Sequence, residues 1–194
     1  MEDNYIYIMV CIVIIFFIAN IYNGIVKLHT TIDSSLSDIS VLLKKRFNLI
    51  PLLVDTVKGY MKYEQETLEK IVKLRIEGLK ALTLEKKLEA NKEINSLLKS
   101  FFMITESYPD LKANKSFLEL QKELSKIENE IANSRRYYNA VVRDYNAQIK
   151  KFPNIVIAKI FNFQKKEYFE LDDNENSRVN NIPSSDFNIK EGRY

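Results

Sequence analysis

The most constraining feature of this chain is an uncharged segment near its N-terminus. Residues 5–22 read YIYIMVCIVIIFFIANIY, and Asn20 is the only strongly polar residue among them. As a helix this segment extends about 27 Å, and the uncharged residues 23–26 lengthen it to the roughly 30 Å of the hydrocarbon core of a bilayer. Tyrosines stand near both ends, where their rings suit the headgroup level. Residues 5–26 are therefore predicted to form a transmembrane helix.

Three other interpretations of this segment were weighed. A cleaved secretory signal needs a basic n-region and a small-residue cleavage site, but residues 1–4 read MEDN and no such site follows. A lipoprotein signal needs a small residue before Cys11, where Val10 stands. A buried core helix is the third alternative. However, eighteen residues that are apolar on every face are too many and too uniform for a core helix in a protein of this size.

The charges on either side of the segment predict its orientation. Glu2 and Asp3 precede it, whereas Lys27 and, further on, the run KKR at 44–46 follow it. Because Lys and Arg mark the cytoplasmic side, we expect a single-pass protein of the cell membrane with residues 1–4 outside and the rest in the cytoplasm. Only Lys27 lies close to the membrane, so the bias is weak. The basic run itself is expected on a solvated face.

The remainder of the chain has the composition of long helices. Only 4 Gly and 4 Pro occur in 194 residues, and apolar residues recur every three or four positions. Breaks at Pro51, 81–83, 108–110 and Pro153 delimit four helices, which short turns would pack as an antiparallel up-down bundle over residues 27–163. The polar residues 164–194 lack periodicity and are predicted to be a disordered tail. The expected fold class is all-α.

The break at Pro51 decides the path of the chain. Proline lacks an N–H and disfavours helix at the preceding residue, so we predict that one helix ends near Phe47 and the next begins near Asn48 as its N-cap. A continuous helix kinked at Pro51 is the alternative. An even number of helices would return residues 152–163 to the bilayer, where their apolar side chains either enter the interface or cap the bundle core.

The residue types present argue against catalysis. His29 is the only histidine and Cys11 the only cysteine, so a Ser-His-Asp triad, a zinc site and an internal disulfide are not expected. There is no Gly-rich phosphate loop and no Glu-x-x-His pair of a di-iron bundle. We therefore expect no enzymatic activity, metal or cofactor. The net charge of +3 is too small and too dispersed to predict a nucleic-acid partner.

Four charged residues fall near the apolar phase of the predicted helices. They are Glu64 and Arg75 in one helix and Glu128 and Arg135 in another. A buried charge must be paired. Our hypothesis is that Glu64 meets Arg135 or Arg75 across the bundle and fixes the helix register. The alternative is that all four lie at the solvated rim.

A Tyr-Asn pair occurs twice in the last long helix. Tyr138-Asn139 and Tyr145-Asn146 are seven residues apart, so the two tyrosines share one helix face and the asparagines the next. The tyrosines are either core residues whose hydroxyls bond at the edge, or part of a ladder that receives a partner helix or peptide.

Two long motifs resemble those of the LemA family. The first is LKKRFNLIPLLV at 43–54, continued by VKGY at 57–60, Glu64 and Arg75; the second runs from YP at 108–109 through Arg135 and both Tyr-Asn pairs to FP at 152–153. The chain departs from the usual family pattern at Asn48, Tyr63 and 159–160, where Asp, His and a Gly-Phe pair are typical. The resemblance extends from the anchor to about Phe169. It implies a bacterial, membrane-anchored four-helix bundle, mostly cytoplasmic, without an established biochemical activity.

These expectations favour a non-enzymatic scaffold that binds another protein or organises the membrane. The alternative is a cytoplasmic signalling adaptor that relays a membrane state to a protein partner, and an enzyme accessory subunit is a third class. Sensing by a folded outside domain is not expected, since only residues 1–4 would lie outside. The expected contacts are lipid through 5–26, with 152–163 as a second candidate, and an unidentified protein. Homo-oligomerisation stays open.

Overall fold

The protein is helical throughout the part that the structure describes. The computed structural model describes residues 2–60 and 64–169, and no strand occurs among them. The elements are α1 (Glu2–Val57), α2 (Gln65–Lys80), α3 (Leu84–Thr105), α4 (Pro109–Lys112), α5 (Lys115–Gln148) and α6 (Asn154–Ile160). The predicted all-α class is confirmed.

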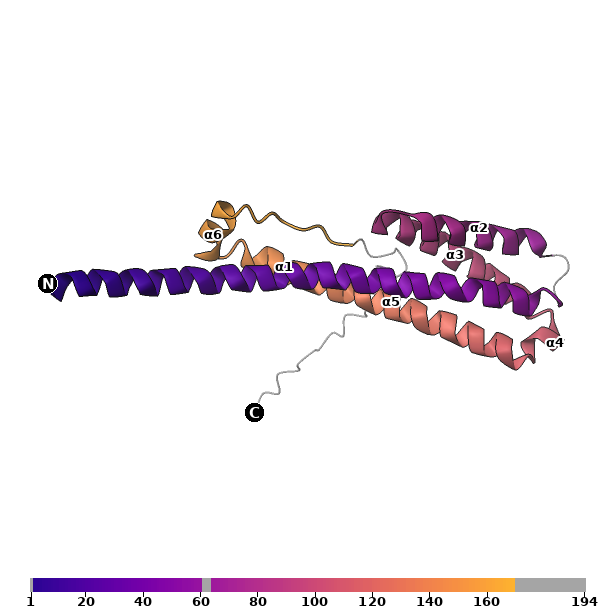
Figure 1. The fold of residues 1–194 in the computed structure, drawn as a ribbon. Coiled ribbons are helices and arrows are strands. Elements are labelled where there is room, and N and C mark those ends of the chain that lie inside the picture. Colours follow the sequence, from indigo (N-terminus) through magenta and orange to yellow (C-terminus); the bar gives the residue numbers. More distant parts are fainter. Residues whose placement is uncertain (1, 61–63, 170–194) are drawn as a thin grey trace, which may run out of the picture.

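Helix α1 extends well beyond the rest of the molecule. Its 56 residues span about 84 Å, and its N-terminal part projects free of the other elements (Figure 1). Among the described residues it is the one helix long and apolar enough to cross a membrane, and its most apolar window is not buried at all. The alternative of a buried core helix is therefore wrong.

The predicted helix break at Pro51 is also wrong, because α1 continues through this residue to Val57. Proline removes the N–H that would bond to the carbonyl four residues earlier, which here belongs to Phe47. The Nε–H of Arg75 on α2 donates to that carbonyl at 2.8 Å. A contact between two helices thus satisfies the group that Pro51 leaves unpaired, and such a contact cannot be read from the local sequence.

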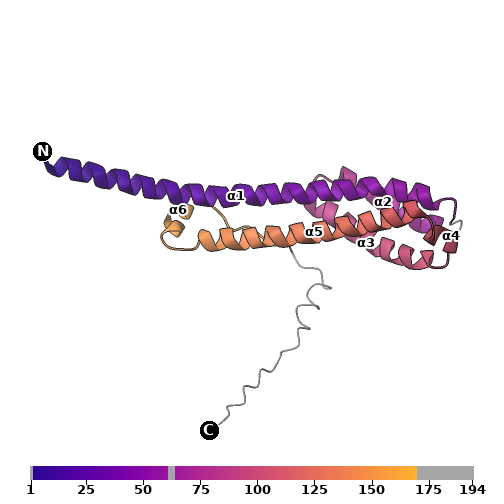
Figure 2. The same cartoon turned by 90° about the horizontal axis from the view of Figure 1, so that it is seen from below.

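The chain reverses direction from α1 to α2, from α2 to α3 and from α3 to α5, but the packing is uneven. Helices α1 and α5 form a long antiparallel pair, while α2 and α3 form a shorter hairpin beside the end of α1 distant from the N-terminus (Figures 1 and 2). The short helix α4 joins α3 to α5 at that far end. Helix α2 begins only at Gln65 because α1 has taken the residues expected at its start.

The core follows a regular stripe of apolar residues on α1. Eight of them, each at most 1% exposed, are Ile25, Ile32, Ile39, Leu43, Phe47, Ile50, Leu53 and Val57. The facing stripe on α5 includes Phe117, Leu124, Ile127, Ile131, Val142 and Tyr145. Spacings of three, four and seven are typical of helices that pack along a heptad seam. Each buried side chain contributes about 1.5–3 kcal/mol, so this seam holds α1 and α5 together along their shared length.

Gly78 marks the closest approach of α2 to α1 and gives a first prediction. A Cβ at Gly78 would lie 2.6 Å from Cζ of Phe47 and 3.3 Å from Cβ of Ala90. Phe47 is only 1% exposed, so its ring would have to leave its packed position to accommodate the added methyl group. We expect Gly78→Ala to lower the free energy of unfolding by about 1–3 kcal/mol, although alanine favours a helix by about 1 kcal/mol.

Urea denaturation of the full chain in detergent micelles, followed by circular dichroism, measures this effect. Gly24→Ala is the matched control, since no atom lies within 4 Å of the Cβ it would add in α1. Equal stability of the two variants would contradict the close approach.

The chain beyond α5 folds back on the α1–α5 pair. After a cis Phe152-Pro153 peptide, α6 packs beside α1, and the chain reverses at Asn162, whose φ is 56°. Residues 164–169, here named the strap, then run extended and hydrogen-bonded along α5. The sequence places this segment in a disordered tail, which is wrong for 164–169 because its bonding partners lie on α5. The rest of that tail, 170–194, lies outside the described residues.

Candidate functional site

An aromatic cluster lies where the uncharged part of α1 ends. The ring of Tyr22 contacts those of Phe161 and Phe163, with centroid distances of 4.7 and 5.8 Å. On α6, Ile157 and Ala158 are buried. The inner face of α6 therefore closes the core at this end, as one of the two sequence interpretations of 152–163 expects.

The opposite face of α6 is apolar and uncovered. Phe152, Val156 and Ile160 are 80%, 48% and 68% exposed. Residues four apart share one side of a helix, so Val156 and Ile160 form one ridge, while Phe152 lies exposed just before the helix. The lysines at 150, 151 and 159 are exposed around this ridge. A positively charged, apolar surface thus lies beside the end of the segment that is apolar enough to cross a membrane.

The two Tyr-Asn pairs of α5 bind the strap, and together we name these four residues the ladder. The side-chain amide of Asn139 donates to the carbonyl of Phe169 at 2.9 Å and accepts its N–H at 2.8 Å. Asn146 does the same with Lys166, at 2.9 and 3.0 Å. Each asparagine therefore pairs with both main-chain groups of one strap residue.

The tyrosines bind two further main-chain carbonyls of the strap, at 164 and 167. The hydroxyl of Tyr145 donates to the carbonyl of Gln164 at 3.1 Å, and that of Tyr138 donates to the carbonyl of Glu167 at 3.0 Å. Burial raises the pKa of both phenols, and the nearby charges of Asp33 and Glu167 add to the effect at Tyr138. Both hydroxyls therefore stay protonated, and remain donors, well above neutral pH.

The spacing of the ladder matches an extended chain. Seven helical residues rise about 10.5 Å, and three extended residues cover about 10 Å. The strap residues held by the asparagines, 166 and 169, are three apart, and so are those held by the tyrosines, 164 and 167. One heptad of α5 thus binds three strap residues. The interpretation as core tyrosines is confirmed, because Tyr145 is a fully buried core residue whose hydroxyl bonds at the edge. The segment that the ladder holds belongs to its own chain, and a partner helix or peptide stays a prediction.

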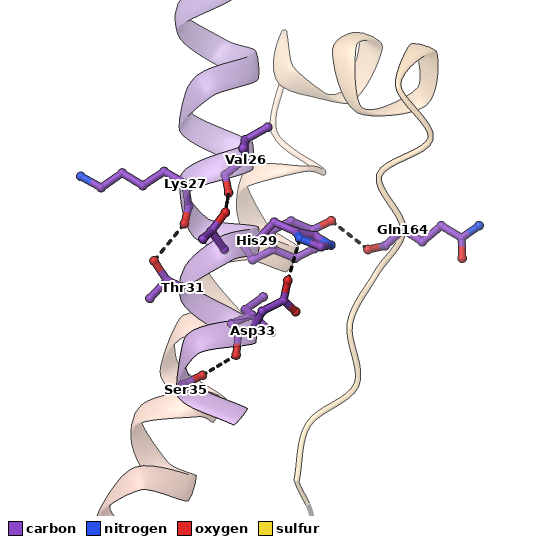
Figure 3. Close-up of polar contacts among 10 residues, drawn as sticks. Val26, Lys27, His29, Thr31, Asp33, Ser35 and Gln164 are labelled. Carbon is purple, nitrogen blue, oxygen red and sulfur yellow. Dashed lines mark hydrogen bonds and ion pairs between the residues drawn. The ribbon is translucent and has the colours of Figure 1, made fainter. Parts of the chain in front are cut away.

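His29 lies at the start of the strap. Figure 3 shows it near Gln164, with its Nδ1 3.5 Å from Oδ2 of Asp33 one turn along α1. Its ring meets that of Tyr145 edge-on at 5.8 Å. The expected surface or interfacial position is thus a half-buried one against α5. No group of three His, Cys, Asp or Glu that could hold a metal ion occurs in the described parts of the chain.

A buried polar cluster joins α1, α3 and α5. Arg46 is only 2% exposed; its guanidinium donates to Asn91 at 2.8 Å and also bonds to Asn95 and Glu128, which contact each other. Burial lowers the pKa of Arg46 to about 10, so it still carries its charge at neutral pH. The cluster therefore sets a cation on α1 against an anion on α5.

The role of Arg46 differs from the one expected from the sequence. The basic run at 44–46 is predicted to lie on a solvated face, which is correct for Lys44 and Lys45 but wrong for Arg46. The available signal was the spacing, because Leu43, Arg46 and Ile50 follow the three-four pattern of the core stripe.

The pairing expected for Glu64 is also wrong. Its carboxylate accepts from the hydroxyl of Tyr108 at 2.8 and 3.0 Å, while Arg75 bonds to the carbonyl of Phe47. Arg135 is half-buried on α5, and Glu128 pairs with Arg46. A charge pair between helices exists, but different residues form it.

The motifs that form these sites also identify the family. The sequence model of the LemA family matches residues 35–183, a range that includes the polar cluster, the ladder and α6. This chain belongs to the LemA family. It is 31% identical over 141 residues to Protein LemA of Metamycoplasma hominis, an alignment that covers 71% of this chain and 64% of the relative.

Two further relatives of this LemA-family chain are magnetosome proteins. Magnetosome protein MamQ 2 of Paramagnetospirillum magneticum is 23% identical over 175 residues, covering 77% of this chain and 64% of the relative. Magnetosome protein MamQ of Magnetospirillum gryphiswaldense is 33% identical over 66 residues, covering 34% of this chain and 24% of the relative. The chain thus matches less than two thirds of the length of these proteins. Together with the apolar part of α1, the similarities support a membrane-associated protein of the LemA type.

Proposed function

We propose that this LemA-family chain is a single-pass, non-enzymatic scaffold that presents a four-helix bundle on the cytoplasmic side of the cell membrane, where it organises the membrane or a protein partner. The observation that carries the proposal is the continuity of α1. The same helix contains the uncovered apolar segment and, through its stripe from Ile25 to Val57, one side of the buried core. From Tyr22 to Val57 this helix rises roughly 50 Å, so the far end of the bundle stands well clear of the lipid.

In this proposal α6 is a second contact with the bilayer. Its inner face holds it against α1 near Tyr22, and its outer ridge of Val156 and Ile160 is uncovered. A short helix with an apolar face and flanking lysines suits the interface of a membrane with anionic lipids. The span and α6 together would fix the tilt of the scaffold, since two contacts constrain a rigid body more than one.

Tryptophan fluorescence tests the second contact directly, because the chain contains no Trp of its own. The variant Ile160→Trp is reconstituted as the full chain in liposomes. Its tryptophan emission is expected at a shorter wavelength than that of tryptophan in buffer, and brominated lipid is expected to quench it. Met103→Trp is the control, since Met103 is 69% exposed near the far end of α3. Quenching that is equally weak at both positions would contradict a bilayer contact of α6.

The continuity of α1 also favours one alternative, the signalling adaptor. A single helix that passes from the membrane into the bundle would transmit a tilt or rotation of the span to the Arg46 cluster. The similarity to magnetosome proteins supports a function at a membrane and is compatible with both ideas. Crosslinking of the intact protein in its membrane, followed by isolation of the products, distinguishes the two. A scaffold should give the same crosslinked assembly under all conditions, whereas an adaptor should give a crosslinked partner only under a stimulus.

A further inference from the structure

The hydrogen bonds between the ladder and the strap involve only the main chain of the strap. All six hydrogen bonds described above end on strap N–H or C=O groups. The strap side chains at 164, 165, 167 and 168 are exposed. The ladder therefore recognises an extended backbone and does not require a particular sequence at these positions.

Aromatic residues at the two ends of the segment add the only selective contacts. The ring of Phe169 packs on Tyr138, with centroids 4.5 Å apart. The ring of Phe163, immediately before the strap, lies 6.5 Å from that of His29 and 5.8 Å from that of Tyr22. The ligand that fits this site is an extended peptide with an aromatic residue at each end, six positions apart.

The strap can leave without unfolding the protein. A hydrogen bond within a protein contributes only about 0.5–1.5 kcal/mol net. Four of the six strap side chains are exposed, while Phe169 and the preceding Phe163 pack against the hydrophobic core. The reversal at Asn162 and the turn at 149–153 lie between α5 and the strap and can act as hinges. A segment held by a few part-buried hydrogen bonds and two aromatic side chains opens before the core does.

We propose that the ladder exchanges its occupant, and that the alternative occupant is the strap of a second copy of this chain. The second copy supplies a segment of identical chemistry, with the same two aromatic ends. This step rests on the proposed membrane anchoring, because one span per chain gives all copies the same orientation and the same height above the bilayer. The strap of one copy then lies level with the ladder of its neighbour. A two-fold axis along the membrane normal lets each copy give and receive one strap, which closes the assembly as a dimer.

Photocrosslinking within the membrane tests the exchange. The photoreactive p-benzoyl-phenylalanine replaces Phe169 in two differently tagged full-length copies produced in the same cells. After irradiation, one tag is purified under denaturing conditions, and mass spectrometry locates the crosslinked residue. We expect the other tag to be retained covalently, with crosslinks from position 169 to the neighbourhood of Tyr138. Crosslinks to that region within single copies only would overturn the proposal, and so would the absence of any crosslink to α5.

Ladder variants separate docking from chance collision. Asn139→Ala combined with Asn146→Ala removes four of the six hydrogen bonds and should lower the yield between copies about tenfold or more. Asn133→Ala, on the exposed side of the same helix, should leave the yield unchanged. A yield that is insensitive to the ladder would overturn the exchange.

Recovery of the chain in the membrane fraction shows whether a negative result contradicts the strap exchange alone or the proposed function as well. Crosslinks confined to single copies of a membrane-bound protein contradict the exchange alone. A chain recovered outside the membrane fraction contradicts the proposed anchoring as well.

Discussion

Replacing Glu128 by Ala is expected to lower the free energy of unfolding by about 3–5 kcal/mol, because it leaves the buried charge of Arg46 without its counter-ion. Arg46 is 2% exposed, whereas the side chain of Glu128 is 35% exposed. The two partners are therefore not equivalent. Arg46→Met removes the buried cation and leaves a carboxylate that water can reach, so it should cost less than Glu128→Ala. The double variant Arg46→Met/Glu128→Ala should likewise be more stable than Glu128→Ala alone.

Urea denaturation of the full chain in detergent micelles provides the measurement. The matched control is Glu123→Ala, which removes another α5 carboxylate that pairs with α1, through Lys45 at 2.9 Å. The Lys45 and Glu123 side chains are 49% and 36% exposed. An exposed ion pair contributes about 0–1 kcal/mol. If Glu128→Ala cost no more than Glu123→Ala, the cluster would not be a buried charge pair.

Arg75→Met is expected to destabilise the protein by about 1–3 kcal/mol, because the carbonyl of Phe47 then loses its part-buried hydrogen bond to the guanidinium. The same substitution should cost little in a Pro51→Ala background. There the new N–H at position 51 can donate to the carbonyl of Phe47 and complete the helix.

A double-mutant cycle measures this coupling. Pro51→Ala alone should leave the protein at least as stable as before, since it removes a helix-breaking residue and supplies a donor. Strict additivity of the two substitutions would contradict the explanation of why α1 passes through Pro51.

The elements that the sequence predicts well are those with local or periodic signals. The uncharged segment at 5–22 can be recognised from its length and hydropathy alone. The stripe from Ile25 to Val57 follows from spacing on a single helix. Arg46 follows the spacing of that stripe too, but arginine is a residue type that is almost never fully buried unless paired, so its burial is not evident without its partner.

The features that could not be predicted depend on contacts between distant segments. The continuation of α1 through Pro51 needs Arg75, which follows 24 positions later in the sequence. The ordered strap needs Asn139 and Asn146 on α5, and nothing in the polar segment 164–169 itself indicates order. The heptad spacing of the Tyr-Asn pairs indicated either core tyrosines or a ladder for a partner, and it could not indicate that the ladder holds a segment of its own chain.

Single-cysteine labelling in intact cells tests the central claim most directly. The substitution Cys11→Ala removes the only cysteine of the sequence. Met103→Cys then introduces a single thiol at a site where the native methionine is 69% exposed. A membrane-impermeant maleimide is expected to leave this thiol unlabelled in intact cells and to label it after permeabilisation, with the protein recovered in the membrane fraction throughout. Labelling from outside intact cells, or recovery of the chain in the soluble fraction, would contradict a membrane-anchored scaffold with its helical bundle in the cytoplasm.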